Sequence, residues 1–429
     1  MATTPDVVAD QPLRTSPEPE ARTGVCPFQI PMKQDEVNSR ALQDQFDVMR
    51  DEGSVAWAQL PYGTVNNGQG WVATGFKEVK AVLMDNRFSV ARKAHGDYPR
   101  ARALEIGAPF PDSFIVMDPP AQSERRRTLM KHLTPKRVNG LRPFTERLVE
   151  DCLDEMERQG PGVDMLPEFV YKVPLFLLCE LLGAPPEERH IYVKHAHDFV
   201  ATRHATAADA SKALETIKTY FKELCCRKRE KPGDDLISAL LLDTEVNGLW
   251  SQEELEGVGT VLLMAGHDST ASFISNCLYW LVHNPETFTR LREEPDLILK
   301  AVDEFLRFLP VGVAPPRARV AIEDVQFGDT LIRKDESVLP IPHAGNLDPK
   351  VYACPRQFDL DREKPAQHLA FGFGAHFCVG SQLARMDIEV ILRGVTQRFT
   401  SLSPMEFDPD WEAKGRTRGP KTLCVQWTK

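Results

Sequence analysis

The chain has 429 residues, of which 42% are hydrophobic and 27% charged, a composition typical of a globular protein. Its formal net charge of −10 and its pI near 5.7 argue against a nucleic-acid-binding protein and against one that binds anionic membranes. The nine cysteines are scattered and odd in number, which favours free thiols in a reducing compartment. We therefore expect a cytoplasmic protein without nucleic-acid or membrane partners.

The first part of the chain predicts short elements. Residues 1–30 are rich in proline, threonine, alanine and aspartate and lack an apolar run, which predicts a disordered tail. Hydrophobic periodicity then predicts a helix at 36–52, strands at 54–60 and 70–74, and a helix at 76–85. A charged and proline-containing stretch at 86–117 predicts irregular structure.

From residue 119 to about 398, helical periodicity dominates. It predicts a buried helix at 166–182 that ends at Gly183, and a long one at 251–283 with Ser251 as N-cap. Short strands are predicted at 318–322, 325–327, 330–332 and 337–340, a helix at 379–398, and further strands at 400–428. The sequence thus predicts a mainly α fold with small β-sheets.

One decapeptide carries most of the chemical information. Residues 371–380 read Phe-Gly-Phe-Gly-Ala-His-Phe-Cys-Val-Gly, so that Cys378 lies in a loop with glycines at 372, 374 and 380. Glycines let the backbone turn tightly and approach a large flat ligand closely. A thiolate held in such a loop can ligate haem iron and favour O–O cleavage.

This loop, F-x-x-G-x-H-x-C-x-G, resembles the haem-binding loop of the cytochrome P-450 family of haem-thiolate monooxygenases. The resemblance implies one helix-rich, triangular haem domain over 31–429. It implies heme b with Cys378 as the iron ligand and O2 as cosubstrate. It also implies a monomer that receives NAD(P)H electrons from a ferredoxin and a ferredoxin reductase. Within the loop, the haem-binding residues would be Phe371, Gly372, His376, Cys378 and Gly380.

The predicted helix at 251–283 contains a second motif, Leu-Leu-Met-Ala-Gly-His-Asp-Ser-Thr at 262–270. Ala265 and Ser269 are four residues apart and share a helix face. Gly266 costs about 1 kcal/mol relative to alanine inside a helix, which indicates a need for space beside the backbone. Asp268 beside hydroxyls can loosen the helical hydrogen bonds and lead water inward.

The segment resembles the oxygen-activation motif of the family, A-G-x-D/E-T-T. The resemblance implies that Ala265 and Gly266 line the haem, that Asp268 handles protons, and that Ser269 takes the place of the catalytic alcohol, followed by Thr270. The family usually has threonine at the position of Ser269. Serine keeps the hydroxyl but lacks the methyl group that restricts χ1.

Three further segments match the family. Arg126, Arg319 and His376 match propionate-binding residues, and Gln122 stands where a histidine is commoner. Glu304-x-x-Arg307 matches a structural acid–base pair that supports the haem loop. The arginine expected as its third partner is replaced by Gln357, and either Arg356 or Arg362 could substitute.

The resemblance also suggests which residues contact the substrate, namely Leu262, Ala265, Val313, Ala314 and Leu423. The main hypothesis is a hydroxylase or epoxidase that modifies a bacterial natural product. The serine at 269 leaves open an oxidative C–C or C–N coupling of aromatic or cyclic dipeptide-type substrates without oxygen insertion. A non-catalytic haem sensor or carrier is the alternative of another class, although it would not need the Asp268–Ser269 pair.

Overall fold

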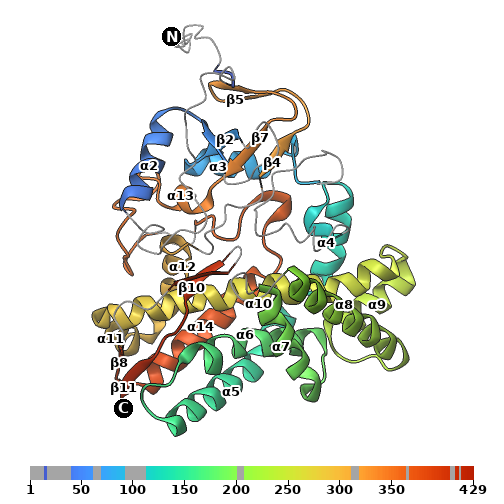
Figure 1. Cartoon of the computed structure of the whole chain (residues 1–429), viewed down its shortest axis with the longest axis vertical. Coiled ribbons are helices and arrows are strands. Elements are labelled where there is room, and N and C mark those ends of the chain that lie inside the picture. The colour runs from blue at the N-terminus through green and yellow to red at the C-terminus, as the bar shows by residue number, and fades with distance from the viewer. Residues whose placement is uncertain are drawn as a thin grey trace, which may run out of the picture.

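The structure is a computed structural model. It describes residues 14–16, 40–60, 69–91, 113–200, 207–310, 318–363, 367–405, 411–414 and 417–429. Figure 1 shows a β-containing part and a larger helical part, and helix α10 (Gln252–His283) runs between them. Within the described residues, no helix is both long and apolar enough to cross a bilayer.

The β-containing part is built on a five-stranded sheet with the order β1-β2-β7-β4-β3. Strands β2 and β7 are parallel, and the other pairs are antiparallel. The strands and the three helices of this part are β1 (Ala56–Gln59), β2 (Gln69–Ala73), β3 (Phe88–Ser89), β4 (Arg319–Ala321), β7 (Ser337–Pro340), α2 (Arg40–Asp51), α3 (Phe76–Met84) and α13 (Pro342–Asn346). A hairpin of β5 (Val325–Phe327) and β6 (Thr330–Ile332) lies beside the sheet.

On the side of the helical part, α10 packs against α6 and α8, and it also contacts β10. The remaining helices are α4 (Ala121–His132), α5 (Pro135–Gln159), α6 (Lys172–Leu182), α7 (Arg189–Val200), α8 (Ala207–Glu230), α9 (Leu236–Asn247), α11 (Pro285–Glu293), α12 (Ile298–Phe308) and α14 (Ser381–Arg398). Two small antiparallel pairs complete this part: β8 (Ser401–Pro404) with β11 (Val425–Thr428), and β9 (Trp411–Lys414) with β10 (Thr417–Pro420).

The sequence predicted α10 and its N-cap correctly. The Ser251 hydroxyl accepts a hydrogen bond from the Glu254 N–H, while the Glu254 carboxylate accepts one from the Ser251 N–H. The helix is then continuous to His283, so the expected loosening near Asp268 is absent. Ser269 instead donates to the Ala265 carbonyl 2.7 Å away, a bond that coexists with the helical hydrogen bonds.

The helix predicted at 166–182 is interrupted in the structure. Residues Leu166–Val170 form a π-helical turn, and α6 begins only at Lys172. Pro174 has no N–H to donate to the carbonyl of Val170, which explains why the regular helix restarts here. The predicted end is correct, because Gly183 adopts φ 73° and closes α6.

Arg14, which lies in the segment predicted to be a disordered tail, contacts the folded part of the chain. Arg14 forms a parallel β-bridge with Thr330 of β6. Its guanidinium donates to the carbonyls of Glu52 and Val55 and lies 3.4 Å from a carboxylate oxygen of Asp329. Gly53, at φ 140°, has no side chain to occupy the space that Arg14 fills.

Candidate active site

The cysteine loop leads into α14, and a backbone hydrogen bond within the loop helps to fix its shape. The Cys378 N–H donates to the carbonyl of Phe371 at 2.9 Å. Gly372 and Gly374 both adopt φ 70°, a conformation that residues with a side chain rarely take. A Cβ at Gly374 would lie 2.5 Å from the Leu83 carbonyl at the end of α3. The close approach predicted for this glycine is therefore to the protein backbone.

Gly380 has a different role from these two glycines. Its φ of −87° is accessible to any residue, and it is the N-cap of α14. A Cβ there would lie 4.0 Å from the Cys378 sulfur, its nearest neighbour. A Cβ at Gly380 would thus be in ordinary van der Waals contact with the sulfur and would not collide with it.

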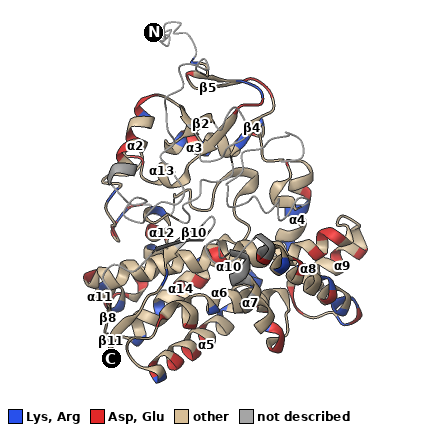
Figure 2. Cartoon of the chain, viewed as in Figure 1, with Lys and Arg blue, Asp and Glu red and all other residues tan. Residues whose placement is uncertain are grey.

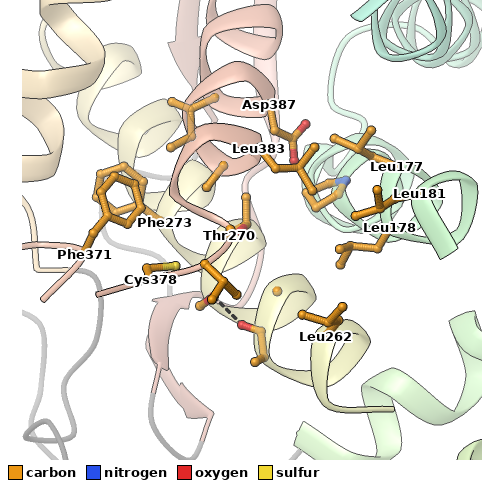
Figure 3. Close-up of a pocket in the computed structure, with 18 of the residues that line it drawn as sticks. Leu177, Leu178, Leu181, Leu262, Thr270, Phe273, Phe371, Cys378, Leu383 and Asp387 are labelled. Carbon is orange, nitrogen blue, oxygen red and sulfur yellow. Dashed lines mark hydrogen bonds between the residues drawn. The ribbon is translucent and has the colours of Figure 1, made fainter. Parts of the chain in front are cut away.

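Cys378 faces a cavity of about 250 Å³ between α10, α14 and α6 (Figure 3). The walls are almost entirely apolar. The side chains with oxygen or sulfur are those of Ser269, Thr270, Cys378 and Asp387. The apolar wall consists of Leu133, Pro174, Leu177, Leu178, Leu181, Leu262, Ala265, Gly266, Phe273, Leu306, Ala370, Phe371, Val379, Gly380, Leu383, Ala384 and Ile388.

The surroundings of Cys378 favour the neutral thiol when no metal is bound. The side chain is accessible from the cavity, but protein atoms enclose its other sides. This burial raises the pKa of the thiol, while a hydrogen bond from the Gly380 backbone and the charge of Arg126 oppose the effect. A bound cation would be needed to keep the sulfur as a thiolate in this setting.

Part of the 262–270 segment of α10 lines the same cavity as Cys378. Ala265, Gly266, Ser269 and Thr270 all line it. A Cβ at Gly266 would approach Leu178 of α6 to 3.2 Å, so this glycine allows α6 to pack closely as well as opening the cavity. Asp268 is half-buried and is not among the cavity-lining residues.

Two residues of α4 reach the cysteine loop. Gln122 is buried, and its amide donates to the Ala375 carbonyl at 2.7 Å. Arg126, one turn later, donates to the Phe377 carbonyl at 2.5 Å, and burial lowers the pKa of its guanidinium. Because the two residues lie on one face of α4, they hold the loop at two points immediately before Cys378.

The remaining predicted haem contacts lie outside the cavity wall. Arg319 is buried on β4, and His376 is half-buried in the 3-10 turn Gly374–His376. Neither residue lines the cavity, and neither do Gln122 and Arg126. Arg126, Arg319 and His376 therefore stay predictions as propionate ligands, and Gln122 stays a prediction as a haem-binding residue.

The structural acid–base pair has the third partner that the sequence left open. Glu304 and Arg307 are completely buried and joined by two hydrogen bonds of 2.7 and 2.8 Å. Arg362 donates to both oxygens of Glu304, whereas Arg356 binds Asp44 and Asp47 of α2 instead. Gln357 contributes only its backbone carbonyl, which accepts from Arg307 and Arg362.

Only some of the residues predicted to contact the substrate line the cavity. Leu262 and Ala265 line the cavity. Leu423 is buried in the core beside Met165 and is not among the cavity-lining residues. Val313 and Ala314 lie outside the described residues.

Sequence reasoning missed two parts of the cavity. Pro174, Leu177, Leu178 and Leu181 form its α6 wall, although the sequence indicated only a buried helix there. Asp387 lines the cavity from α14 and is buried. Residues three and four positions away from Asp387, namely Leu383, Ala384, Val390 and Ile391, are all apolar, so an acid on this helix face was the available signal.

Comparisons with known proteins agree with this arrangement. The family model described as cytochrome P450 matches residues 188–423. Nocardicin C N-oxygenase of Nocardia uniformis subsp. tsuyamanensis is 36% identical over 88% of this chain and 94% of its own length. Mycinamicin IV hydroxylase/epoxidase of Micromonospora griseorubida is 32% identical over 96% of this chain and 100% of its own length.

Solved structures show the same fold. The mixed-function enzyme MycG superposes with a TM-score of 0.82 at 32% identity, covering 89% of this chain and 96% of that one. An enzyme with biaryl coupling reactivity gives a TM-score of 0.81 at 32% identity, over 89% and 96%. The chain therefore belongs to the cytochrome P-450 family of haem-thiolate monooxygenases.

Proposed function

We propose that the chain binds heme b through the Cys378 thiolate and oxidises a small organic substrate with O2 and with electrons from a ferredoxin. The observation that carries the proposal is the position of Cys378 in an apolar cavity, opposite the hydroxyl-bearing face of α10. Family membership supports thiolate-bound haem iron and the use of O2. The choice of heme b, the site residues and the electron donor are the parts proposed.

The residues present fit such a group. The cavity has one sulfur ligand, no side chain on Gly380 next to that sulfur, and apolar walls suited to a porphyrin. Because burial raises the pKa of the Cys378 thiol, the protein alone does not stabilise the thiolate. A bound iron ion would supply the positive charge that keeps the Cys378 sulfur as a thiolate. The ligand set thus suits a metal embedded in a flat apolar molecule.

When bound, the haem supplies O2 activation, in which two electrons and two protons enter as one oxygen atom goes to the substrate and the other to water. The chain's own residues hold and move the protons. The Ser269 hydroxyl donates a hydrogen bond to the Ala265 carbonyl, so its oxygen is available to accept a hydrogen bond from water. We assign Asp268, half-buried and adjacent in sequence, to deliver protons toward Ser269 and Thr270.

The electrons must come from a partner protein, and we propose a ferredoxin with its reductase. Helix α4 lies beside the cysteine loop and carries Arg127 and Lys131 on its exposed surface. In Figure 2 the ribbon of α4 has blue Lys and Arg positions. A local basic surface on a chain of net charge −10 suits an acidic electron carrier.

Relatives suggest the reaction class. They include an N-oxygenase and a hydroxylase/epoxidase, so we propose oxygen insertion into a bacterial natural product. One structural neighbour has biaryl coupling reactivity, and serine replaces threonine at 269 here, so oxidative coupling is the second candidate. Labelled O2 separates them, because only insertion leaves label in the organic product.

The first experiment is the spectrum of the reduced protein with CO. The wild type should show the red-shifted band of thiolate-ligated haem, and Cys378→Ala should lack it. Cys354→Ala is the matched control, because Cys354 is an exposed cysteine outside the cavity. A colourless wild-type protein after expression with iron and porphyrin precursor, or an unchanged band in Cys378→Ala, would refute the proposal.

A further inference from the structure

A cluster of polar side chains lies beside Phe371, the first residue of the cysteine loop. At its centre is Arg385 of α14, whose guanidinium donates a hydrogen bond to the Asp303 carboxylate of α12. The same guanidinium lies 3.0 Å from the Nε2 atom of His368 and 5.4 Å from the centre of the Phe371 ring. A cation this close to an aromatic ring is attracted to it. Arg385 therefore joins α12 and α14 to the segment that leads into the cysteine loop.

Phe371 links this cluster to the cavity that Cys378 lines. Its ring belongs to the cavity wall, whereas Arg385, Asp303 and His368 are not among the cavity-lining residues. Figure 3 shows Phe371 and Cys378 among the side chains around the cavity. The Phe371 carbonyl also accepts the hydrogen bond from the Cys378 N–H at 2.9 Å. One residue thus contacts both Arg385 and the proposed iron ligand.

The cluster contains two opposite charges. Burial lowers the pKa of His368, whose side chain is 2% exposed, to about 4, so the ring is neutral at pH 7 and accepts a hydrogen bond from Arg385. Arg385 and Asp303 carry the charges, and their side chains are 33% and 17% exposed. Partly buried charges are screened less by salt than exposed ones. Either charge would therefore act on its surroundings if the other were removed.

Charges at this place affect how readily a haem held by Cys378 accepts an electron. Reduction adds one negative charge to the site, so a nearby cation favours the reduced state and a nearby anion disfavours it. The cavity walls are almost entirely apolar, and an apolar medium weakens these interactions less than water does. In the wild type the two charges of the pair largely cancel.

We propose that the Arg385–Asp303 pair, acting through the Phe371 ring, sets the reduction potential of the bound haem. Arg385 is thus a positioning residue for electron uptake, because it holds the ring in place while Asp303 balances its charge. Loss of either charge moves the potential, and the two losses move it in opposite directions. The inference rests on the proposed function, because there is a potential to set only if Cys378 binds haem iron.

The test is a dye-equilibrated redox titration of the holoproteins at pH 8, where His368 stays neutral even at its ordinary pKa of 6.5. Arg385→Gln leaves the Asp303 carboxylate unopposed and should lower the midpoint potential. The equilibrium constant for reduction should fall about threefold or more, which is about 30 mV for one electron. Asp303→Asn leaves the cation unopposed and should raise the potential by a similar amount. The double variant should lie near the wild type.

Arg393→Gln is the matched control, because it removes the same charge from α14 about two turns further along, where the partner is Glu389. Its potential should stay near that of the wild type. Arg385→Lys keeps the charge and should recover most of the potential lost in Arg385→Gln. Unchanged potentials in both single variants, shifts of the same sign, or an equal shift in Arg393→Gln would overturn the inference.

The CO spectrum separates the proposed function from this inference. If the wild type lacks the thiolate band, the proposed function fails and the inference falls with it. If the band is present in the wild type and in the variants, the signs of the two potential shifts decide the role of the pair alone. Should Arg385→Gln not fold, Asp303→Asn still decides, because a potential that does not rise in that variant contradicts the inference.

Discussion

The Arg362 Nε lies 3.1 Å from each carboxylate oxygen of Glu304, a residue 58 positions earlier in the chain. Glu304 also binds Arg307, so one buried carboxylate joins α12 to the segment that leads into the cysteine loop. Arg362 further donates to the carbonyls of Ala353 and Gln357. Arg362 thus holds the backbone of the segment at 353–357, although the arginine expected at position 357 is replaced by glutamine.

Arg362→Ala should destabilise the protein by about 3 kcal/mol, because removing one member of a buried ion pair leaves an incompletely compensated charge. Arg356→Ala should cost about 1 kcal/mol or less, since its pairs with Asp44 and Asp47 are solvent-exposed. Urea unfolding of both holoprotein variants measures the difference. Arg362→Lys should recover little, because an ammonium cannot form the same planar contacts. Equal losses in the two alanine variants would contradict this prediction.

Gly374→Ala should be more damaging than Gly372→Ala. Both positions have φ 70°, which costs an alanine about 1–2 kcal/mol. At Gly374 a Cβ would also collide with the backbone of Leu83 at 2.5 Å, whereas at Gly372 the nearest atom is 3.9 Å away. The melting temperature and haem content of the two variants test this. Similar values for both would show that the α3 contact does not matter.

Asp387 predicts a pH-dependent cost to folding. The unfolded carboxyl has a pKa near 3.8 and the folded one about 8, so below pH 3.8 both states are protonated. Between these values the unfolded state has released a proton that the folded state retains, which disfavours folding by about 1.4 kcal/mol per pH unit. Above about pH 8 the cost is constant.

Asp387→Asn removes this cost. Its free energy of unfolding should therefore rise relative to wild type from pH 4 to pH 8, as measured by denaturant titration at each pH. Glu389→Gln provides the comparison on the same helix. A difference between Asp387→Asn and wild type that does not vary with pH would contradict the raised pKa.

Ser269→Ala should increase the peroxide formed per NADH several-fold, because the variant keeps the cavity shape but loses the hydroxyl oxygen that accepts from water. Ser269→Thr should couple at least as well as wild type, since its methyl group restricts χ1. Product, peroxide and NADH are measured together. Unchanged coupling in Ser269→Ala would remove this residue from the mechanism and favour Thr270.

Local sequence patterns predicted the parts of the fold that depend on neighbouring residues. The Ser251 cap, the Gly183 end of α6 and the strands at 325–327, 330–332 and 337–340 follow from such patterns, and the structure contains them. The break before α6 was missed because the segment 166–182, which contains Pro167 and Pro174, was predicted as one buried helix.

The site was predicted where one loop or one helix turn carries the chemistry. Only the family resemblance predicted that Cys378 and the 265–270 segment belong to one site. In the structure, Cys378 and residues of this segment line a single cavity. The choice of Arg362 over Arg356 depends on how the chain between α13 and the cysteine loop turns in space. The α6 wall and Asp387 depend on tertiary packing, which no local pattern specifies.

Arg14 gives the amino-terminal segment a structural role far from its own position in the chain. A protein shortened to begin after residue 17 would lose the cation that caps the carbonyl end of α2 at Glu52 and neutralises Asp329. Among the described residues, the hydrogen bond from the Ser54 N–H to the Asp329 carboxylate would still join the β5–β6 turn to the segment after α2. Such a truncation is thus expected to loosen the contact between the β5–β6 hairpin and the segment that enters β1.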